Sequence, residues 1–165
     1  MVVFVRAMTT RMPFPPTADA VSVVRAYYAV VADLLSSEAD LAPLLDPDLR
    51  VIEHPNALSP GGSEHNRQEA LAGFRAGKIL LAEQDLDIHE TIATADTVAV
   101  RATWSGVVAR SAGGFAAGTR LTAHVASFLT ARDGRIVRHE TFDCYEPFQR
   151  DATPPVSPAD TLGSR

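Results

Sequence analysis

The sequence is poor in the features that most directly identify a protein's partners or location. A single cysteine, Cys144, excludes an intramolecular disulfide and fits a reducing cytoplasm. A single lysine, Lys78, and the absence of any cluster of basic residues accompany a formal net charge of −5. Nucleic acids and anionic membranes both need a basic face, so neither is expected as a partner.

Long apolar runs are also missing. No stretch approaches the roughly 18 residues that a membrane-spanning helix needs, and the N-terminus lacks the long apolar segment and cleavage site of a secretory signal. We therefore expect a cytoplasmic protein that does not enter a membrane. Hydrophobic residues make up 46% of the chain and charged residues 21%, as in ordinary globular proteins, so its 165 residues predict one domain with a substantial core.

The two ends of the chain differ in composition from the middle. We interpret residues 1–16 as a disordered lead and residues 149–165, which are rich in proline, serine and small residues, as a disordered tail. The folded domain is expected to span residues 17–148. No internal repeat or low-complexity tract interrupts that span.

The sequence of the first half of the domain predicts mainly helices. Apolar residues at helical spacing predict a helix in "ADAVSVVRAYYAVVADLLSS", capped by Thr17 or Asp19, with Leu35 on its core face. "EADLAPLL" predicts a short second helix, and "LRVIEH" a strand. "PNALSPGGSEHN" is expected to be a loop that ends at Asn66, the cap of a third helix in "RQEALAGFRAGKILLA".

The second half reads as strands. Four alternating segments, residues 85–94, 95–110, 119–131 and 135–148, are joined by turn sequences and predict consecutive hairpins. Helices gathered before an antiparallel sheet indicate the α+β class. In the last strand, "RHETFDCY", His139, Thr141 and Asp143 share one face, and Phe142 and Cys144 share the other.

Four short stretches carry a family resemblance: "VIEHP" before a loop, "NRQEALAGF" opening the third helix, "TWSG" in a strand, and "DGRIVRHETFD" near the end. In this order they resemble the nuclear transport factor 2-like superfamily, which includes ketosteroid isomerases, limonene epoxide hydrolases and SnoaL-type polyketide cyclases. The likeness covers about residues 20–148. It implies an α+β cone, a cystatin-like barrel in which a curved, mostly antiparallel sheet wraps the N-terminal helices. The concave face would line a pocket, and the convex face would form a homodimer.

The resemblance also assigns roles to individual residues. His54 falls where the isomerases keep their general base, and Tyr27 or Tyr28 where they keep an oxyanion-holding tyrosine. The cyclases rely on an acid/base group near the end of the last strand, where Asp143 or His139 stands. The implied register directs a larger set of side chains into the cone: Val100, Ala102, Trp104, His124, Ala126, Phe128, His139, Thr141 and Asp143.

The chain departs from the family at two of these sites. Ala126 stands where the isomerases place a protonated aspartate in the oxyanion hole. Arg101 could match the arginine of the epoxide hydrolases, but Thr103 and Thr141 stand at the neighbouring positions where those enzymes use aspartates. Epoxide hydrolysis is therefore not expected.

The leading hypothesis is a cofactor-independent acid/base enzyme, an isomerase or cyclase, that acts on a small apolar molecule. His54 would be the base and Asp143 or His139 the partner acid. Tyr27 or Tyr28 with His124 would hold the developing oxyanion. Trp104, Phe128 and Thr141 would line the substrate pocket. No metal is expected, since no HxH or HxxxH spacing occurs.

Two other classes stay open. A non-catalytic binding module would have all its histidines paired to protein, without unusual titration. An assembly module would fill the cone with side chains and leave no cavity beneath Trp104. Single residues also have plainer interpretations: His54 bonded to the loop backbone, His124 a core histidine paired with His139, and Cys144 a buried or interfacial hydrophobe.

Overall fold

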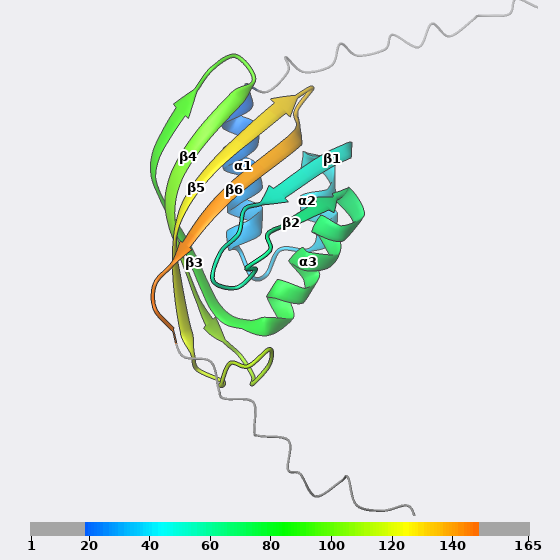
Figure 1. Ribbon diagram of the computed structural model, residues 1–165. Helices are drawn as coiled ribbons and strands as arrows, with labels where there is room; N and C mark the ends of the chain where they lie inside the picture. Colours follow the sequence, from blue (N-terminus) through cyan, green and yellow to red (C-terminus); the bar gives the residue numbers. More distant parts are fainter. Residues whose placement is uncertain (1–18, 149–165) are drawn as a thin grey trace, which may run out of the picture.

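A helix lies inside a curved sheet in the computed structural model, which describes residues 19–148 (Figure 1). The predicted disordered lead and tail lie outside the described residues. The helices are α1 (Ala20–Ala32), α2 (Glu38–Leu41), the 3₁₀ turn η1 (Ala42–Leu44) and α3 (Arg67–Leu80). The strands are β1 (Leu45–Glu53), β2 (Ser63–Asn66), β3 (Leu81–Ala93), β4 (Thr97–Val108), β5 (Arg120–Arg132) and β6 (Arg135–Tyr145).

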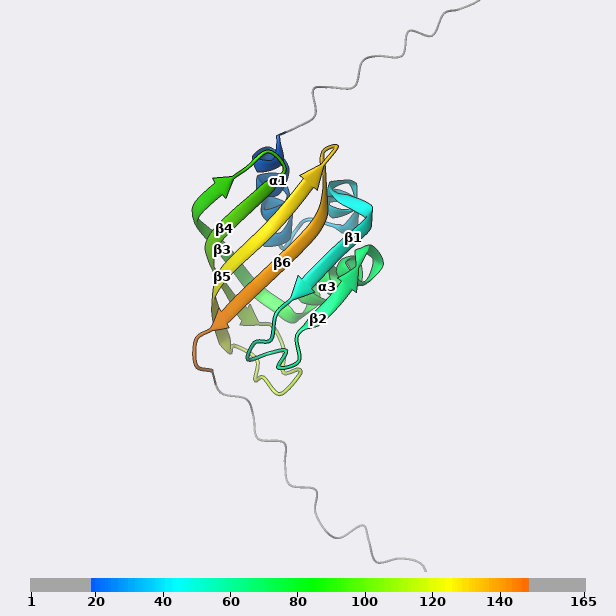
Figure 2. The same ribbon diagram turned by 45° about the horizontal axis from the view of Figure 1, so that its top comes forward.

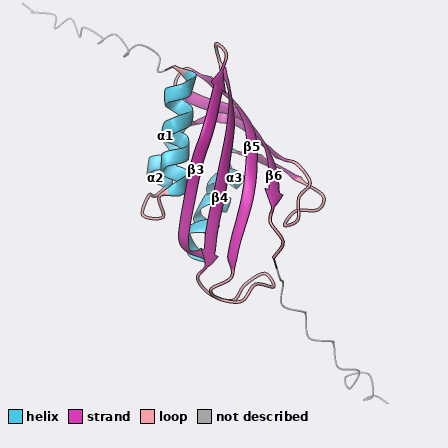
Figure 3. Ribbon diagram, turned by 90° about the vertical axis from the view of Figure 1, so that its left-hand side faces the viewer, coloured by secondary structure: helices cyan, strands magenta, loops and turns pink. Residues whose placement is uncertain are grey.

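The six strands form one sheet in the order β2-β1-β6-β5-β4-β3. The predicted hairpins from β3 to β6 are antiparallel, whereas β1 runs parallel to β6. Figures 2 and 3 show the strong curvature of this sheet, with α1 and α3 on its concave side. The α+β cone expected from the sequence is confirmed. No helix in residues 19–148 is long and apolar enough to cross a membrane.

Helix α1 is shorter than its apolar pattern predicts. Asp19 caps it by accepting a hydrogen bond from the Ser22 N–H at 2.8 Å, and Val24 and Tyr28 are buried against the sheet. The chain leaves the helix at Asp33, whose carboxylate accepts the Leu35 N–H at 2.8 Å in a local turn. Leu35 is consequently 94% exposed, and its predicted place on the core face is wrong.

The segment between β1 and α3 contains more structure than the predicted loop. Its last residues form β2, which pairs antiparallel with β1. Asn66 then caps α3 as predicted, in a capping box with Glu69. This arrangement holds β1 between β2 and β6, and so fixes which β1 side chains face the inside of the cone.

Parallel pairing of β1 with β6 places Val51 beside His139 and Glu53 beside Thr141. Side chains of paired residues lie on the same face of a sheet. Val51 packs against the main core, which α1 forms with the concave face of the sheet. Glu53, two residues further on, therefore also faces the concave side.

Candidate functional site

The inner face of β6 carries His139, Thr141 and Asp143 into a cavity of about 210 Å³, which we call the sheet cavity. Their inward orientation is as the alternation of the sequence predicts. The other polar side chains that line the sheet cavity are Tyr28, Gln84, Ser127 and Tyr145. Its apolar wall includes Trp104, Leu86 and Val125, so the expected inward position of Trp104 is confirmed.

A short relay of hydroxyl groups leads to Asp143. The Ser127 hydroxyl donates to Thr141 Oγ1 at 3.1 Å, and the Thr141 hydroxyl donates to Asp143 Oδ1 at 2.7 Å. Ser127 and Thr141 are almost fully buried. Buried polar groups that satisfy one another hold a fixed geometry, so the relay orients the Asp143 carboxylate within the cavity.

Asp143 has a perturbed proton affinity. Burial raises the pKa of its carboxyl group, the hydrogen bond from Thr141 lowers it, and the charge of Glu53 raises it further. Glu53 is held by the Asn56 amide at 2.6 Å from Oε1 and by the Ser63 hydroxyl at 2.9 Å from Oε2. The site thus contains two carboxyl groups, one fixed by donors and one with a raised pKa.

Glu53 was missed by the sequence analysis, although a signal was available. Val51 is apolar and Glu53 follows it at strand spacing, so an inward Val51 requires an inward Glu53. The resemblance to the isomerases instead predicted the next residue, His54, as the general base.

Tyr27, Tyr28 and His139 meet in the interior. The Tyr27 hydroxyl lies 3.2 Å from His139 Nδ1, and the Tyr27 and Tyr28 rings both make edge contacts with the imidazole. Within residues 19–148, neither the Tyr28 hydroxyl nor His139 Nε2 has a hydrogen-bond partner, although both atoms are buried. Such atoms are costly to bury and are normally paired, so they mark a place for a polar ligand atom.

Burial also fixes the protonation of these three side chains. It lowers the pKa of His139 to about 4 and raises the pKa of Tyr28 to about 12. It raises the pKa of Tyr27 as well. At neutral pH the imidazole is therefore uncharged and both phenols keep their protons, so each phenol can donate to an oxygen atom.

His54 does not face the cavity, and the expectation that it would is wrong. Its Nε2 lies 2.7 Å from Glu140 Oε1, and its ring stacks on Phe142 at 3.9 Å between centroids. Glu140 and Phe142 belong to the convex face of β6. Because side chains alternate along β1, the inward position of Glu53 turns His54 outward. Its predicted role as general base has no support from this geometry.

The expected inward positions on β5 are also wrong for His124, Ala126 and Phe128. The His124 side chain is 62% exposed and lies 3.4 Å from Glu146, and Phe128 is 48% exposed. The inward residues of β5 include Ala123, Val125 and Ser127. His139 pairs with Leu129 in the sheet, so the pairing of His139 with His124 does not form.

One irregularity explains this error. After the turn at Asp133 and Gly134, Ala131 pairs with Ile136, but Thr130 pairs with Arg138, so Val137 is an extra residue on β6. A bulge of one residue shifts the register of everything beyond it. Without it, His139 would stand opposite Phe128 and share its face, as the sequence analysis assumed.

Trp104 and Gln84 tie the end of α1 to the sheet. The Trp104 indole donates to Gln84 Oε1 at 3.1 Å, and the Gln84 amide donates to the carbonyls of Val31 and Ala32 at 2.7 and 3.0 Å. Carbonyls in the last turn of a helix lack partners within the helix, and Gln84 supplies one. Gln84 also lines the sheet cavity.

The convex face carries the remaining candidates. Cys144 is exposed there, so its expected burial is not found in the single chain. Among residues 19–148, no group of three or more His, Cys, Asp or Glu side chains is placed to hold a metal ion.

Comparisons with known proteins agree with this fold. A family model described as a SnoaL-like domain matches residues 23–139. No curated protein matches the chain. The chain is similar to the structure of IdmH, a candidate polyketide cyclase from Streptomyces antibioticus, at 22% identity and a TM-score of 0.61. That match covers 75% of this chain and 91% of IdmH.

Two further structures have similar folds. An epoxide hydrolase of the LEH-like type from M. tuberculosis is 19% identical with a TM-score of 0.58, and the match covers 80% of this chain and 86% of that one. A protein with a ketosteroid isomerase-like fold from Catenulispora acidiphila is 18% identical with a TM-score of 0.56, over 73% of this chain and 83% of that one. At these identities the likeness shows the fold alone.

Proposed function

The chain belongs to the SnoaL-like family of the nuclear transport factor 2-like superfamily, and we propose that it is a cofactor-independent acid/base enzyme. Its substrate is a small, largely apolar molecule with an enolisable carbonyl group. The reaction is an isomerisation or an aldol-type ring closure within the sheet cavity. One observation carries this proposal: Asp143, with a raised pKa, and the unpaired Tyr28 hydroxyl line the same cavity.

Asp143 is the proton carrier. A carboxylate with a raised pKa is a stronger base than an ordinary aspartate and, once protonated, still an effective acid. It takes a proton from the carbon next to the carbonyl group and leaves an enolate. Returning the proton to another carbon gives an isomer. Alternatively, the enolate carbon attacks a second carbonyl and closes a ring, and Asp143 returns its proton to the alkoxide that this attack forms. The relay from Ser127 through Thr141 keeps the carboxylate in place throughout.

Tyr28 holds the oxygen on which negative charge develops. Its hydroxyl is buried, keeps its proton at neutral pH and forms no hydrogen bond of normal geometry within the described residues, although Ser127 lies near enough to lower its pKa. Tyr28 and Asp143 line the same cavity, and the charge of Asp143 contributes to the raised pKa of Tyr28. A donor aimed at the enolate oxygen in a dry cavity stabilises the transition state more than the ground state. Trp104 and Leu86 form the wall against the apolar part of the substrate.

The other two classes receive less support. A binding module was expected to pair all its histidines, but His139 Nε2 has no partner in the described chain and burial lowers the His139 pKa to about 4. An assembly module was expected to leave no cavity beneath Trp104, but the sheet cavity lies there. Both observations favour a site built for a ligand, and the position of Asp143 favours chemistry on it.

Solvent exchange at carbon tests the proposal. Cyclohexanone and 2-tetralone, two ketones of different size, are incubated with the protein in D₂O, and deuterium incorporation next to the carbonyl group is followed by NMR. We expect the protein to accelerate exchange, and Asp143→Asn to reduce the acceleration by about 100-fold or more, because the amide cannot accept the proton. The control is Asp133→Asn in the exposed turn, where asparagine tolerates the positive φ.

The proposal fails under either of two results. The first is that the wild-type protein accelerates exchange of neither ketone. The second is that Asp143→Asn, folded by circular dichroism, exchanges them as fast as Asp133→Asn does.

A further inference from the structure

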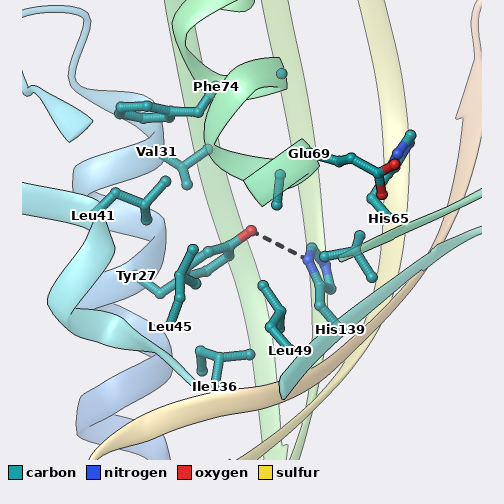
Figure 4. A pocket seen from close by; sticks show the side chains of 13 residues that line it. Tyr27, Val31, Leu41, Leu45, Leu49, His65, Glu69, Phe74, Ile136 and His139 are labelled. Atoms are coloured by element: carbon teal, nitrogen blue, oxygen red, sulfur yellow. Dashed lines mark hydrogen bonds between the residues drawn. The ribbon is translucent and has the colours of Figure 1, made fainter. Parts of the chain in front are cut away.

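A second cavity, of about 290 Å³, lies between α1, β1 and α3 on the other side of His139 (Figure 4). We call it the helix cavity. His139 and Val31 line both cavities, so the two adjoin. Most of its lining is aliphatic or aromatic, including Leu41, Leu45, Leu49, Val51, Phe74 and Ile136. No part of the proposed proton transfer uses this space.

Few polar groups line the helix cavity. Figure 4 shows the hydrogen bond between Tyr27 and His139 in the midst of the apolar side chains, and His65 and Glu69 together at one side. Glu69 is exposed and marks the solvent side of the cavity. Tyr27 and His139 keep some accessible surface although they lie deep within the cone, and that surface faces the cavity.

The charge of the lining excludes an anionic occupant. Neither lysine nor arginine is among the described residues that line the helix cavity. Burial lowers the pKa of His139 to about 4, so the imidazole carries no positive charge at neutral pH. A carboxylate placed here would lose its hydration without gaining a lysine or arginine partner, and the acidic Glu69 would lie nearby. Losing that hydration costs free energy. An uncharged molecule incurs no such cost.

The volume sets the size of the occupant. An apolar cavity of about 150 Å³ holds one benzene molecule, and the helix cavity is close to twice as large. Two fused rings, or a branched group of about ten non-hydrogen atoms, match this space. The Tyr27–His139 pair can satisfy one oxygen atom on such a molecule, because a phenol and a neutral imidazole can each donate or accept.

We propose that the helix cavity is a binding site for an uncharged apolar molecule, or an uncharged apolar part of a larger one, with the size of two fused rings and one oxygen atom at the Tyr27–His139 pair. This inference concerns binding alone and stands apart from the proton transfer assigned to Asp143. If the helix cavity binds no such molecule, the expected result of the deuterium-exchange experiment does not change. If Asp143 does not catalyse exchange, the expected binding in the helix cavity does not change.

A matched pair of probes tests the proposal. 2-Naphthol and 2-naphthoate share one ring system, but at pH 7 the phenol is neutral and the carboxylate is ionised. We expect 2-naphthol to bind and 2-naphthoate to bind at least about tenfold more weakly in calorimetric titrations. In NMR spectra, bound 2-naphthol should show contacts to the Phe74 ring and the Ile136 methyl groups, both of which line the helix cavity.

Two alanine-to-leucine variants distinguish the cavities. Ala70→Leu fills the helix cavity from α3, and Ala123→Leu fills the sheet cavity from β5 with the same side chain. We expect Ala70→Leu to weaken 2-naphthol binding by about tenfold or more, and Ala123→Leu to leave it nearly unchanged. Gly73→Leu is a second filler of the helix cavity, since a Cβ at Gly73 meets no atom within 4 Å.

Three results would overturn the proposal. The first is that the two probes bind equally well. The second is that the contacts of 2-naphthol run to Trp104 and Val125, with binding lost in Ala123→Leu. The third is that the folded wild-type protein shows no binding of 2-naphthol at millimolar concentration.

Discussion

Glu53 and Asp143 are carboxyl groups of the same inner surface with different surroundings. Glu53 accepts hydrogen bonds from the Asn56 amide and the Ser63 hydroxyl, which hold its carboxylate in place. Among the described residues Asp143 has one donor, Thr141, and burial and the charge of Glu53 raise its pKa. A fixed anion beside a second carboxyl group is a common way to prepare that group for proton transfer at neutral pH.

Removing the charge of Glu53 should therefore lower the pKa of Asp143. Glu53→Gln keeps an oxygen that can accept a hydrogen bond, and removes the repulsion that disfavours the charged form of Asp143. The pKa is measured by ¹³C NMR titration of the Asp143 carboxyl group. Glu64→Gln is the control, because Glu64 lies on the surface in an ion pair with Arg50. An Asp143 pKa that is identical in Glu53→Gln and wild type would contradict the electrostatic role of Glu53.

At the scale of the elements, α3 forms one wall of the helix cavity and carries two glycines within its helical span. Gly77 adopts helical backbone, and a Cβ added there meets no atom within 4 Å. Gly106 on β4 differs, since an added Cβ would lie 2.8 Å from the Trp104 ring. Gly106 must be small because the Trp104 indole packs directly against it. At Gly77 no neighbouring atom requires the absence of a side chain.

The same substitution should have opposite effects at these two glycines. Gly77→Ala is expected to raise the free energy of unfolding by about 0.5–1 kcal/mol, because alanine loses less backbone entropy in a helix. Gly106→Ala is expected to lower it, since the Trp104 ring must move. Urea unfolding of both variants measures the change. A loss of stability in Gly77→Ala would contradict the open space described at that position. Unchanged stability in Gly106→Ala would contradict the close packing of Gly106 against Trp104.

The helices and strands also show which parts of the structure can be predicted from the sequence. Helical spacing and strand alternation predicted α1, α3 and the four hairpin strands, because these patterns are set by burial on one face. The inward positions of Thr141, Asp143 and Trp104 followed from alternation. The faces of β5 did not follow from alternation. The bulge at Val137 has no sequence signal such as a glycine, and it reverses which β5 side chains share a face with those of β6. The β1–β2 pairing was missed for a similar reason, since four residues are too few for a pattern.

At the scale of the whole molecule, the cone combines a largely apolar interior, which holds a few polar groups, with a convex face that bears exposed apolar residues. Phe128 is 48% and Phe142 39% exposed there, beside the stacked ring of His54. Association of two chains through this face stays a prediction. Inside, His139 stands between the two cavities and is the buried group whose pKa, at about 4, departs furthest below its ordinary value.

Acid should therefore reduce the stability of the whole fold through His139. Its pKa is about 4 in the folded chain and about 6.5 in an unfolded one. Below about pH 6.5 the unfolded state gains a proton that the folded state does not accept until about pH 4. Stability is therefore lost as the pH falls through this window, by about 2 kcal/mol between pH 7 and pH 5.

Urea unfolding at pH 7 and pH 5 measures this loss. His139→Gln should show a smaller difference between the two pH values than the wild type, because glutamine does not titrate. His124→Gln, at an exposed position, should behave as the wild type does. Equal pH dependence in wild type and His139→Gln would mean that His139 is not held neutral by burial.

The central claim is that Asp143 transfers a proton in the sheet cavity, and the pH dependence of deuterium exchange into 2-tetralone tests it most directly. We predict a rate that rises with pH through one ionisation, above the ordinary aspartate pKa of about 3.9, and then levels off, because only the carboxylate form accepts the proton. This dependence should vanish in Asp143→Asn. A rate that does not change with pH, or a profile that persists in Asp143→Asn, would contradict the account.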